Sequence, residues 1–210
     1  MDEYCEKLVR KIYHDGINYI SPVKEIINLK FKNDEITPYL IYNLFLATDL
    51  IKNSRLLIIL HNQSEKIFPL NQQINLKETI KEILTSFKDI FDFNAKIDID
   101  GNIEFTGNRD LFYALLENLL SNCIRFSNFF EILTERNTLI IKNYHNLSNI
   151  NYSFFNLPVK NDKFGIAGSG LGLEVVKSII AKMDLQFETE INENEIIVKI
   201  YFKNNERNNN

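Results

Sequence analysis

A glycine-rich stretch, GSGLGL at positions 168–173, stands directly before a helical pattern. Glycines at Gly168, Gly170 and Gly172 would let backbone N–H groups converge on an anion at the positive end of a helix, as phosphate sites require. A tight turn that packs a strand against a helix needs similar residues. The stretch therefore indicates either a phosphate loop or a structural turn, and the residues elsewhere in the chain have to decide between them.

A second group of candidate residues follows one face of a predicted helix in ENLLSNCIRFS, positions 117–127. At 100° per residue, Asn118, Asn122 and Arg125 fall within about 60° of one another, and apolar side chains occupy the opposite face. Two carboxamides and a guanidinium can hold a hydrated Mg²⁺ and a triphosphate. The alternative is an ordinary solvated helix face.

The third candidate is His14, which is followed by Asp15 in the first predicted helix. His14 points about 145° away from the apolar stripe of that helix, so it is expected to face solvent, where a reactant can reach it. Asp15 could hold the proton on one ring nitrogen and leave the other nitrogen free to accept a phosphoryl group. The alternative is a surface histidine without a chemical role.

Composition narrows the class of protein. A hydrophobic share of 45% with 16 Phe and 9 Tyr is enough for a globular core, and the net charge of -4 provides no basic surface for nucleic acid or membrane. Cys5 and Cys123 lie far apart, so neither a disulfide framework nor a metal site is expected. Because no apolar run reaches about 18 residues and no signal segment is recognisable, we expect a cytoplasmic protein.

The elements that must position these residues fall into two groups. Two long helices are predicted over 1–31 and 37–63, the second with Thr37 as N-cap and Pro38 at its first position. They form an antiparallel hairpin too apolar to cover its own surface, and pairing with a second copy into a four-helix bundle would cover it. We assign residues 1–66 to this dimerisation and phosphotransfer domain.

Residues 67–203 mix helices with strands, which predicts an α+β chain whose second domain is an α/β sandwich with one mixed sheet covered on one face by helices. Asn75 and Glu78 are spaced as a capping box, and Asp100-Gly101 is a hairpin turn signal. The predicted elements in order are a helix at 75–91, a β-hairpin at 96–105, a helix at 108–127, a strand at 137–143, a helix at 173–183 and a hairpin at 185–202. The asparagine-rich tail 204–210 is expected to be disordered.

The two motifs together resemble the ATPase domain of histidine kinases, which has the Bergerat or GHKL fold. NLLSNCIRFS is similar to the N box of that family, and GSGLGL is similar to its second glycine box. The resemblance implies that Asn118 and Asn122 hold the metal and that Arg125 stands where a lysine usually contacts phosphate. It also implies that the three loop glycines lie along the triphosphate.

The chain differs from that family where the adenine base of the nucleotide would bind. The family's first glycine box carries an Asp that reads the adenine amino group, whereas this chain has Asn143 and then YHNLSN, without Asp or Gly. Glu174 adds a carboxylate in the first turn after the loop, where it would repel a triphosphate. We therefore expect a degenerate ATPase-like domain that needs no cofactor, with ATP and Mg²⁺ bound only if the chain is a kinase.

The stretch HDGINYI at 14–20 is similar to the H box, the phosphoacceptor motif of the same family, with His14 as the acceptor. Since the hairpin starts within a few residues of Met1, no room for a sensor is expected. The whole chain thus resembles the ChpT-type histidine phosphotransferases, homodimers that pass phosphoryl groups between receiver domains and have lost ATP binding. In another register, anchored on ISPV at 20–23, Ile17 would take the place of the histidine.

Three functions follow from these residues. The first is a phosphotransferase that relays phosphoryl groups between response-regulator receiver domains through phospho-His14, with Mg²⁺ supplied by the receiver. The second is a soluble ATP-dependent histidine kinase, and the third is a non-catalytic dimeric scaffold that binds a response regulator. None of them involves nucleic acid or a membrane.

Overall fold

The computed structural model describes residues 37–61, 68–88, 91–99, 103–127, 129–144, 171–192 and 194–202. The chain divides into two compact units, Met1–Ser64 and Glu65–Asn210, and each is described by itself. The predicted first helix with His14 and Asp15, the glycines Gly168 and Gly170, and the tail 204–210 lie outside the described residues.

The described part of the first unit is one helix, α2, which runs from Thr37 to His61 and so begins where the Thr-Pro signal predicts. Its sequence is apolar on nearly every side. Leu40 and Leu50 are 42% and 44% exposed, whereas Tyr42 and Asn53 are buried. Among the described helices, none is both long and apolar enough to cross a bilayer.

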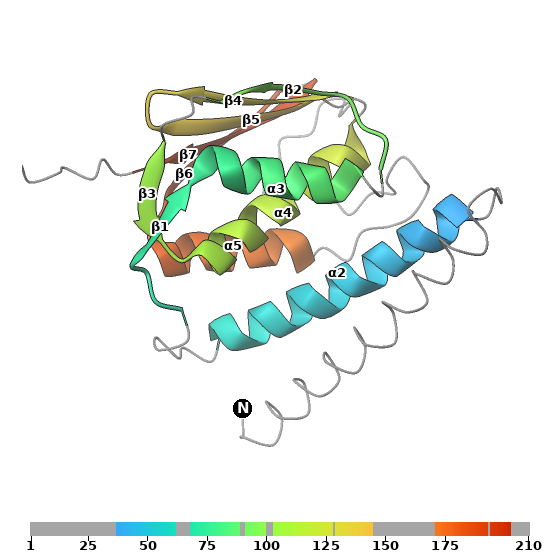
Figure 1. Cartoon of the computed structure of the whole chain (residues 1–210), viewed down its shortest axis with the longest axis horizontal. Helices are drawn as coiled ribbons and strands as arrows, with labels where there is room; N and C mark the ends of the chain where they lie inside the picture. Colours follow the sequence, from blue (N-terminus) through green and yellow to red (C-terminus); the bar gives the residue numbers. More distant parts are fainter. Residues whose placement is uncertain are drawn as a thin grey trace, which may run out of the picture. The chain divides into compact units, whose positions relative to one another are not determined.

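The second unit is built on a five-stranded sheet whose strand order is β2-β4-β5-β7-β6. Strand β2 is parallel to β4, and the other neighbours are antiparallel. The helices α3, α4 and α5 lie against one face of this sheet (Figure 1), which confirms the predicted sandwich. The strands are β2 (Ala95–Asp98), β4 (Phe130–Glu135), β5 (Thr138–Tyr144), β6 (Gln186–Ile191) and β7 (Glu195–Tyr201), and the helices are α3 (Leu76–Lys88), α4 (Arg109–Phe126) and α5 (Leu171–Met183).

The hairpin predicted at 96–105 is wrong. Strand β2 joins the five-stranded sheet, whereas β3 (Glu104–Gly107) pairs with β1 (Gln72–Asn75) in a separate two-stranded sheet. The ring of Phe105 in β3 meets the Phe112 ring of α4 edge-on and stacks on the ring of Phe202, which follows β7, and these contacts hold β3 away from a local hairpin. Tertiary packing therefore outweighs the local Asp-Gly turn signal.

An aromatic cluster fixes α4 against the sheet. Phe112 is fully buried, and its ring meets those of Phe105 and Phe202 edge-on, with centroid separations of 4.7 and 5.8 Å. Phe105 and Phe202 stack on each other at 4.4 Å. Since α4 carries the asparagines and the arginine of the predicted site, this cluster is what holds them in place.

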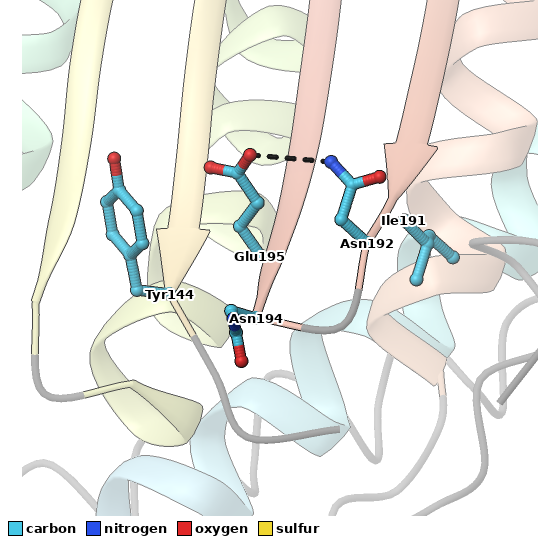
Figure 2. Close-up of a pocket in the computed structure, with 5 residues that line it drawn as sticks. All are labelled: Tyr144, Ile191, Asn192, Asn194 and Glu195. Atoms are coloured by element: carbon cyan, nitrogen blue, oxygen red, sulfur yellow. Dashed lines mark hydrogen bonds between the residues drawn. The ribbon is translucent and has the colours of Figure 1, made fainter. Parts of the chain in front are cut away.

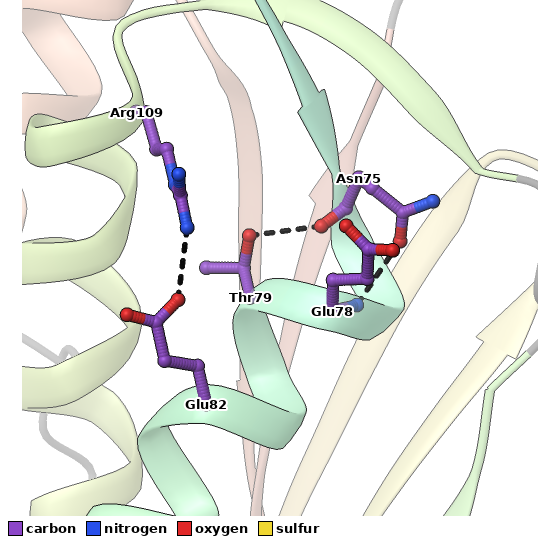
Figure 3. Close-up of polar contacts among 5 residues, drawn as sticks. All are labelled: Asn75, Glu78, Thr79, Glu82 and Arg109. Atoms are coloured by element: carbon purple, nitrogen blue, oxygen red, sulfur yellow. Dashed lines mark hydrogen bonds and ion pairs between the residues drawn. The ribbon is translucent and has the colours of Figure 1, made fainter.

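Polar contacts cap the start of α3 and connect this helix to α4 (Figure 3). The side chain of Asn75 accepts a hydrogen bond from the backbone N–H of Glu78 at 3.0 Å, which is the asparagine half of the predicted capping box. Thr79 donates to the carbonyl of Asn75, and the guanidinium of Arg109 pairs with Glu82 at 2.9 Å. The two helices are thereby tied together at the surface.

Cys123 provides a pH-dependent probe of α4. Burial raises the pKa of its thiol from an ordinary 9.0 to about 12. Above pH 9 the unfolded chain loses a proton that the folded chain keeps, so the thiol's contribution to stability is complete below pH 9 and is lost as the pH rises toward 12. Urea unfolding between pH 10 and 11 should show a stability loss steeper by up to about 1.4 kcal/mol per pH unit in the wild type than in Cys123→Ala, with no such difference near pH 8. Equal slopes in the two proteins would contradict the burial of this thiol.

Candidate functional site

Two of the three residues in the polar stripe of α4 are buried. Asn118 and Arg125 are 5% and 6% exposed, and Asn122 is half-buried. The alternative of an ordinary solvated helix face is therefore wrong for Asn118 and Arg125. The apolar residues of the opposite face are buried as predicted, so α4 is a central helix enclosed on nearly all sides.

Asn118 and the glycine loop meet in the structure. A Cβ atom added to Gly172 would lie 2.7 Å from Oδ1 of Asn118, well inside contact distance. The Nδ2 atom of Asn118 donates a hydrogen bond to the carbonyl of Ala114, one turn earlier, at 2.9 Å. The order of the two motifs thus predicts their proximity correctly, at least for Gly172, which is the loop glycine among the described residues.

The guanidinium of Arg125 is turned toward a neighbouring ring. Its Cζ atom lies 5.0 Å from the centroid of the Phe126 ring, a distance at which a cation is attracted by an aromatic face. With only 6% of the residue exposed, the charge of Arg125 is largely withdrawn from solvent. The described conformation therefore does not present this cation at the surface as a phosphate contact would require.

Asn143 lies near the C-terminal end of β5. Its register partners are Phe130 on β4 and Ile196 on β7, which place it on the helix-covered face of the sheet. Because β4 starts shortly after α4 ends, Asn143 and the end of α4 lie at the same side of the domain. The Oδ1 atom of Asn143 is buried and accepts no hydrogen bond within the described part of the chain. A buried acceptor without a donor is costly, and it fits a ligand that brings an N–H group.

The residues that are present fit a metal–nucleotide only in part. Asn143 offers a buried acceptor that suits the amino group of a base, and half-buried Asn122 remains available as an oxygen ligand. Asn118 does not fit as a metal ligand in its described conformation, because its oxygen is packed against Gly172. If a nucleotide binds, Asn143 would hold the base and Asn122 the metal, while the metal would neutralise phosphate charge.

A shallow pocket of about 500 Å³ lies beside the turn between β6 and β7 (Figure 2), and it contains none of the predicted residues. Asn192 donates a hydrogen bond to Glu195 there at 3.4 Å. The phenol of Tyr144 donates to Glu131, and burial, that hydrogen bond and the negative charges of Glu131 and Glu195 raise the pKa of Tyr144. Only strand and turn residues form this pocket, so no sequence motif could have revealed it.

These elements and the contact between α4 and α5 define a histidine-kinase fold of the GHKL type. The chain is similar to AdeS, a histidine kinase of Acinetobacter baumannii, with 21% identity and a TM-score of 0.57 over 90% of this chain and 96% of that one. It is also similar to the mycobacterial sensor histidine kinase MprB, with 14% identity and a TM-score of 0.51 over 63% of this chain and 96% of that one. The sequence matches no family model and no curated protein. At these identities the likeness establishes the fold.

Proposed function

We propose that the chain is a histidine phosphotransferase that relays phosphoryl groups between receiver domains in the cytoplasm through His14, without ATP. The observation that carries the proposal is the state of the ATP-type site within a histidine-kinase fold. Asn118 and Arg125 are buried, with the oxygen of Asn118 against Gly172 and the charge of Arg125 over Phe126. Because these side chains are engaged in contacts within the domain, they favour a domain that has the fold of an ATPase but does not bind or hydrolyse ATP.

The proposed reaction is a reversible exchange between an aspartyl phosphate and a histidine. A ring nitrogen of His14 attacks the phosphorus, the bond from phosphorus to the aspartyl oxygen breaks, and the aspartate leaves as a carboxylate. The imidazole proton is held on the other nitrogen by Asp15, so the attacking nitrogen keeps its lone pair. The receiver brings the Mg²⁺ that neutralises the phosphoryl oxygens, and this chain brings a positioned nucleophile.

The proposal includes a homodimer. Helix α2 leaves Leu40 and Leu50 more than two-fifths exposed while burying Asn53 and Tyr42. Apolar exposure on an otherwise apolar helix is relieved when a second helical hairpin covers it. A dimeric bundle would also present two copies of His14, one for each bound receiver.

The test is to incubate the protein with receiver domains phosphorylated by a small-molecule phosphodonor. We expect an acid-labile, alkali-stable phosphate on the protein, located at His14 by peptide mass spectrometry, and its passage to a second receiver. A protein that binds the phosphorylated receiver but takes up no phosphate would instead be the scaffold of the third hypothesis.

A second candidate function is an ATP-dependent histidine kinase, and one observation favours it. The oxygen of Asn143 is buried on the helix-covered face of the sheet without a donor among the described residues, although burying an acceptor in this way costs about 1–3 kcal/mol. An adenine amino group would satisfy it. The carboxamide lacks the charge of the family's Asp, so any such binding would be weaker.

Calorimetry with a non-hydrolysable ATP analogue and Mg²⁺ separates the two functions. We expect no binding heat from the wild type at millimolar ligand, because the oxygen of Asn118 lies against Gly172 and the charge of Arg125 is turned toward Phe126. Heat in the wild type, together with a loss of about 5–150-fold in affinity for Asn143→Leu, would instead support the kinase. Heat that Asn143→Leu leaves unchanged would place the nucleotide elsewhere.

A further inference from the structure

Gly172 is the second residue of α5, and Asn118 lies in the middle of α4. If Gly172 carried a Cβ atom, the nearest atoms of Asn118 would be its Oδ1 at 2.7 Å, its Cγ at 3.6 Å and its Cβ at 4.0 Å. Only the oxygen is closer than ordinary contact distance. Among the described residues, the space around Gly172 is therefore limited by one atom of one side chain.

The Asn118 side chain is not free to move out of the way. Its Nδ2 atom donates to the carbonyl of Ala114 at 2.9 Å, and the residue is 95% buried, being 5% exposed. Turning the carboxamide away from α5 would break that hydrogen bond inside a closed environment, where an unpaired amide is costly. The same hydrogen bond that orients the amide thus holds the oxygen against Gly172.

We infer that Asn118 and Gly172 form a size-matched packing contact that sets where α5 begins on α4, and that Asn118 is a positioning residue and not a metal ligand. The third glycine of the GSGLGL stretch then serves helix packing, whatever the loop before it binds. This inference is independent of phosphoryl transfer, because it concerns two residues of the second unit and their mutual fit.

A double-mutant cycle in urea tests the contact. In the wild-type background, Gly172→Ala should lower the urea midpoint by roughly 0.5–1 M, since overpacking a buried contact is destabilising. In the Asn118→Ala background the nearest remaining atom of the described residues is the Cβ, 4.0 Å away, so the same change should leave the midpoint unchanged or raise it. The midpoint can rise in this background because alanine has a higher helix propensity than glycine.

Gly107→Ala is the matched control. A Cβ at Gly107 would meet the Cε atom of Met183 at 2.8 Å, and its three nearest atoms belong to Met183, Ile74 and Phe105, so its effect should be the same in both backgrounds. If Gly172→Ala fails to fold alone, recovery of folded protein in the Asn118→Ala background supports the contact. An equal loss in both backgrounds, or no loss in the wild type, would overturn it.

Asn118→Asp tests the choice between positioning and metal binding. The new carboxylate replaces the amide donor to Ala114 with an acceptor, so the melting temperature should fall, and millimolar Mg²⁺ should not restore it. A carboxylate is a stronger ligand for Mg²⁺ than a carboxamide. A rise in melting temperature with Mg²⁺ in this variant, absent from the wild type, would identify residue 118 as a metal ligand and overturn the inference.

Discussion

Phe112→Ala is expected to lower the free energy of unfolding of the second unit by about 3–5 kcal/mol. The ring is fully buried and meets Phe105 and Phe202 edge-on, so its removal leaves a cavity and two aromatic contacts unmade. Because Phe202 follows β7 and Phe105 belongs to β3, the cavity would loosen α4 from both sheets at once. Urea unfolding followed by far-UV circular dichroism measures the change.

Phe112→Leu is the control for this substitution, because it keeps most of the apolar volume and should cost well under half as much. A second control, Lys177→Ala on the exposed face of α5, should stay within about 0.5 kcal/mol of the wild type. If Phe112→Ala were as stable as the wild type, the aromatic cluster would not be what holds α4.

His14→Gln is expected to abolish phosphoryl uptake from a phosphorylated receiver, with a loss of at least about 1,000-fold in rate. Glutamine keeps a polar side chain of similar reach and has no nucleophilic nitrogen at neutral pH. The protein should still bind the receiver, because the substitution removes the acceptor and leaves the rest of the surface unchanged. Stopped reactions analysed for protein-bound phosphate give the rate.

His61→Gln is the matched control, since His61 is an exposed histidine in the last turn of α2. It should transfer at the wild-type rate. Asp15→Asn should retain part of the rate, because it weakens the orientation of the imidazole and leaves the nucleophile in place. Full transfer by His14→Gln would show that another residue accepts the phosphoryl group, whereas no uptake by the wild type would be the result expected for the ISPV register or for a scaffold.

Sequence reasoning is most successful where a pattern repeats along one element. The helical periodicity around Leu116 and Leu120 predicts α4 within one residue of its observed start, and the alternation near Ile197 predicts the final hairpin. Strand β4 is missed because FEILTE is short and mixes polar with apolar residues. The pairing partner of β2 could not be predicted, because that partner, β4, follows α4 in the sequence.

For the site, motif order predicts that the asparagines of α4 meet the start of α5. The sequence could not predict which of the two asparagines would pack against the start of α5. Asn118 and Asn122 are equivalent by spacing, and only the position of Gly172 distinguishes the buried one from the half-buried one. Likewise Asn143 is identifiable as a substitution for Asp, but its unpaired oxygen is a property of the packed sheet.

The parallel pairing of β2 with β4 also affects the order in which the strands of the sheet form. Pairing β2 with β4 closes a loop of chain that contains β3 and the whole of α4, whereas β4 and β5 meet across a two-residue turn. Closing the longer loop costs more chain entropy before any pairing energy is returned. Strand β2 is four residues long and lies at the edge of the sheet. We therefore expect it to pair late during folding and to separate from the sheet early during local unfolding.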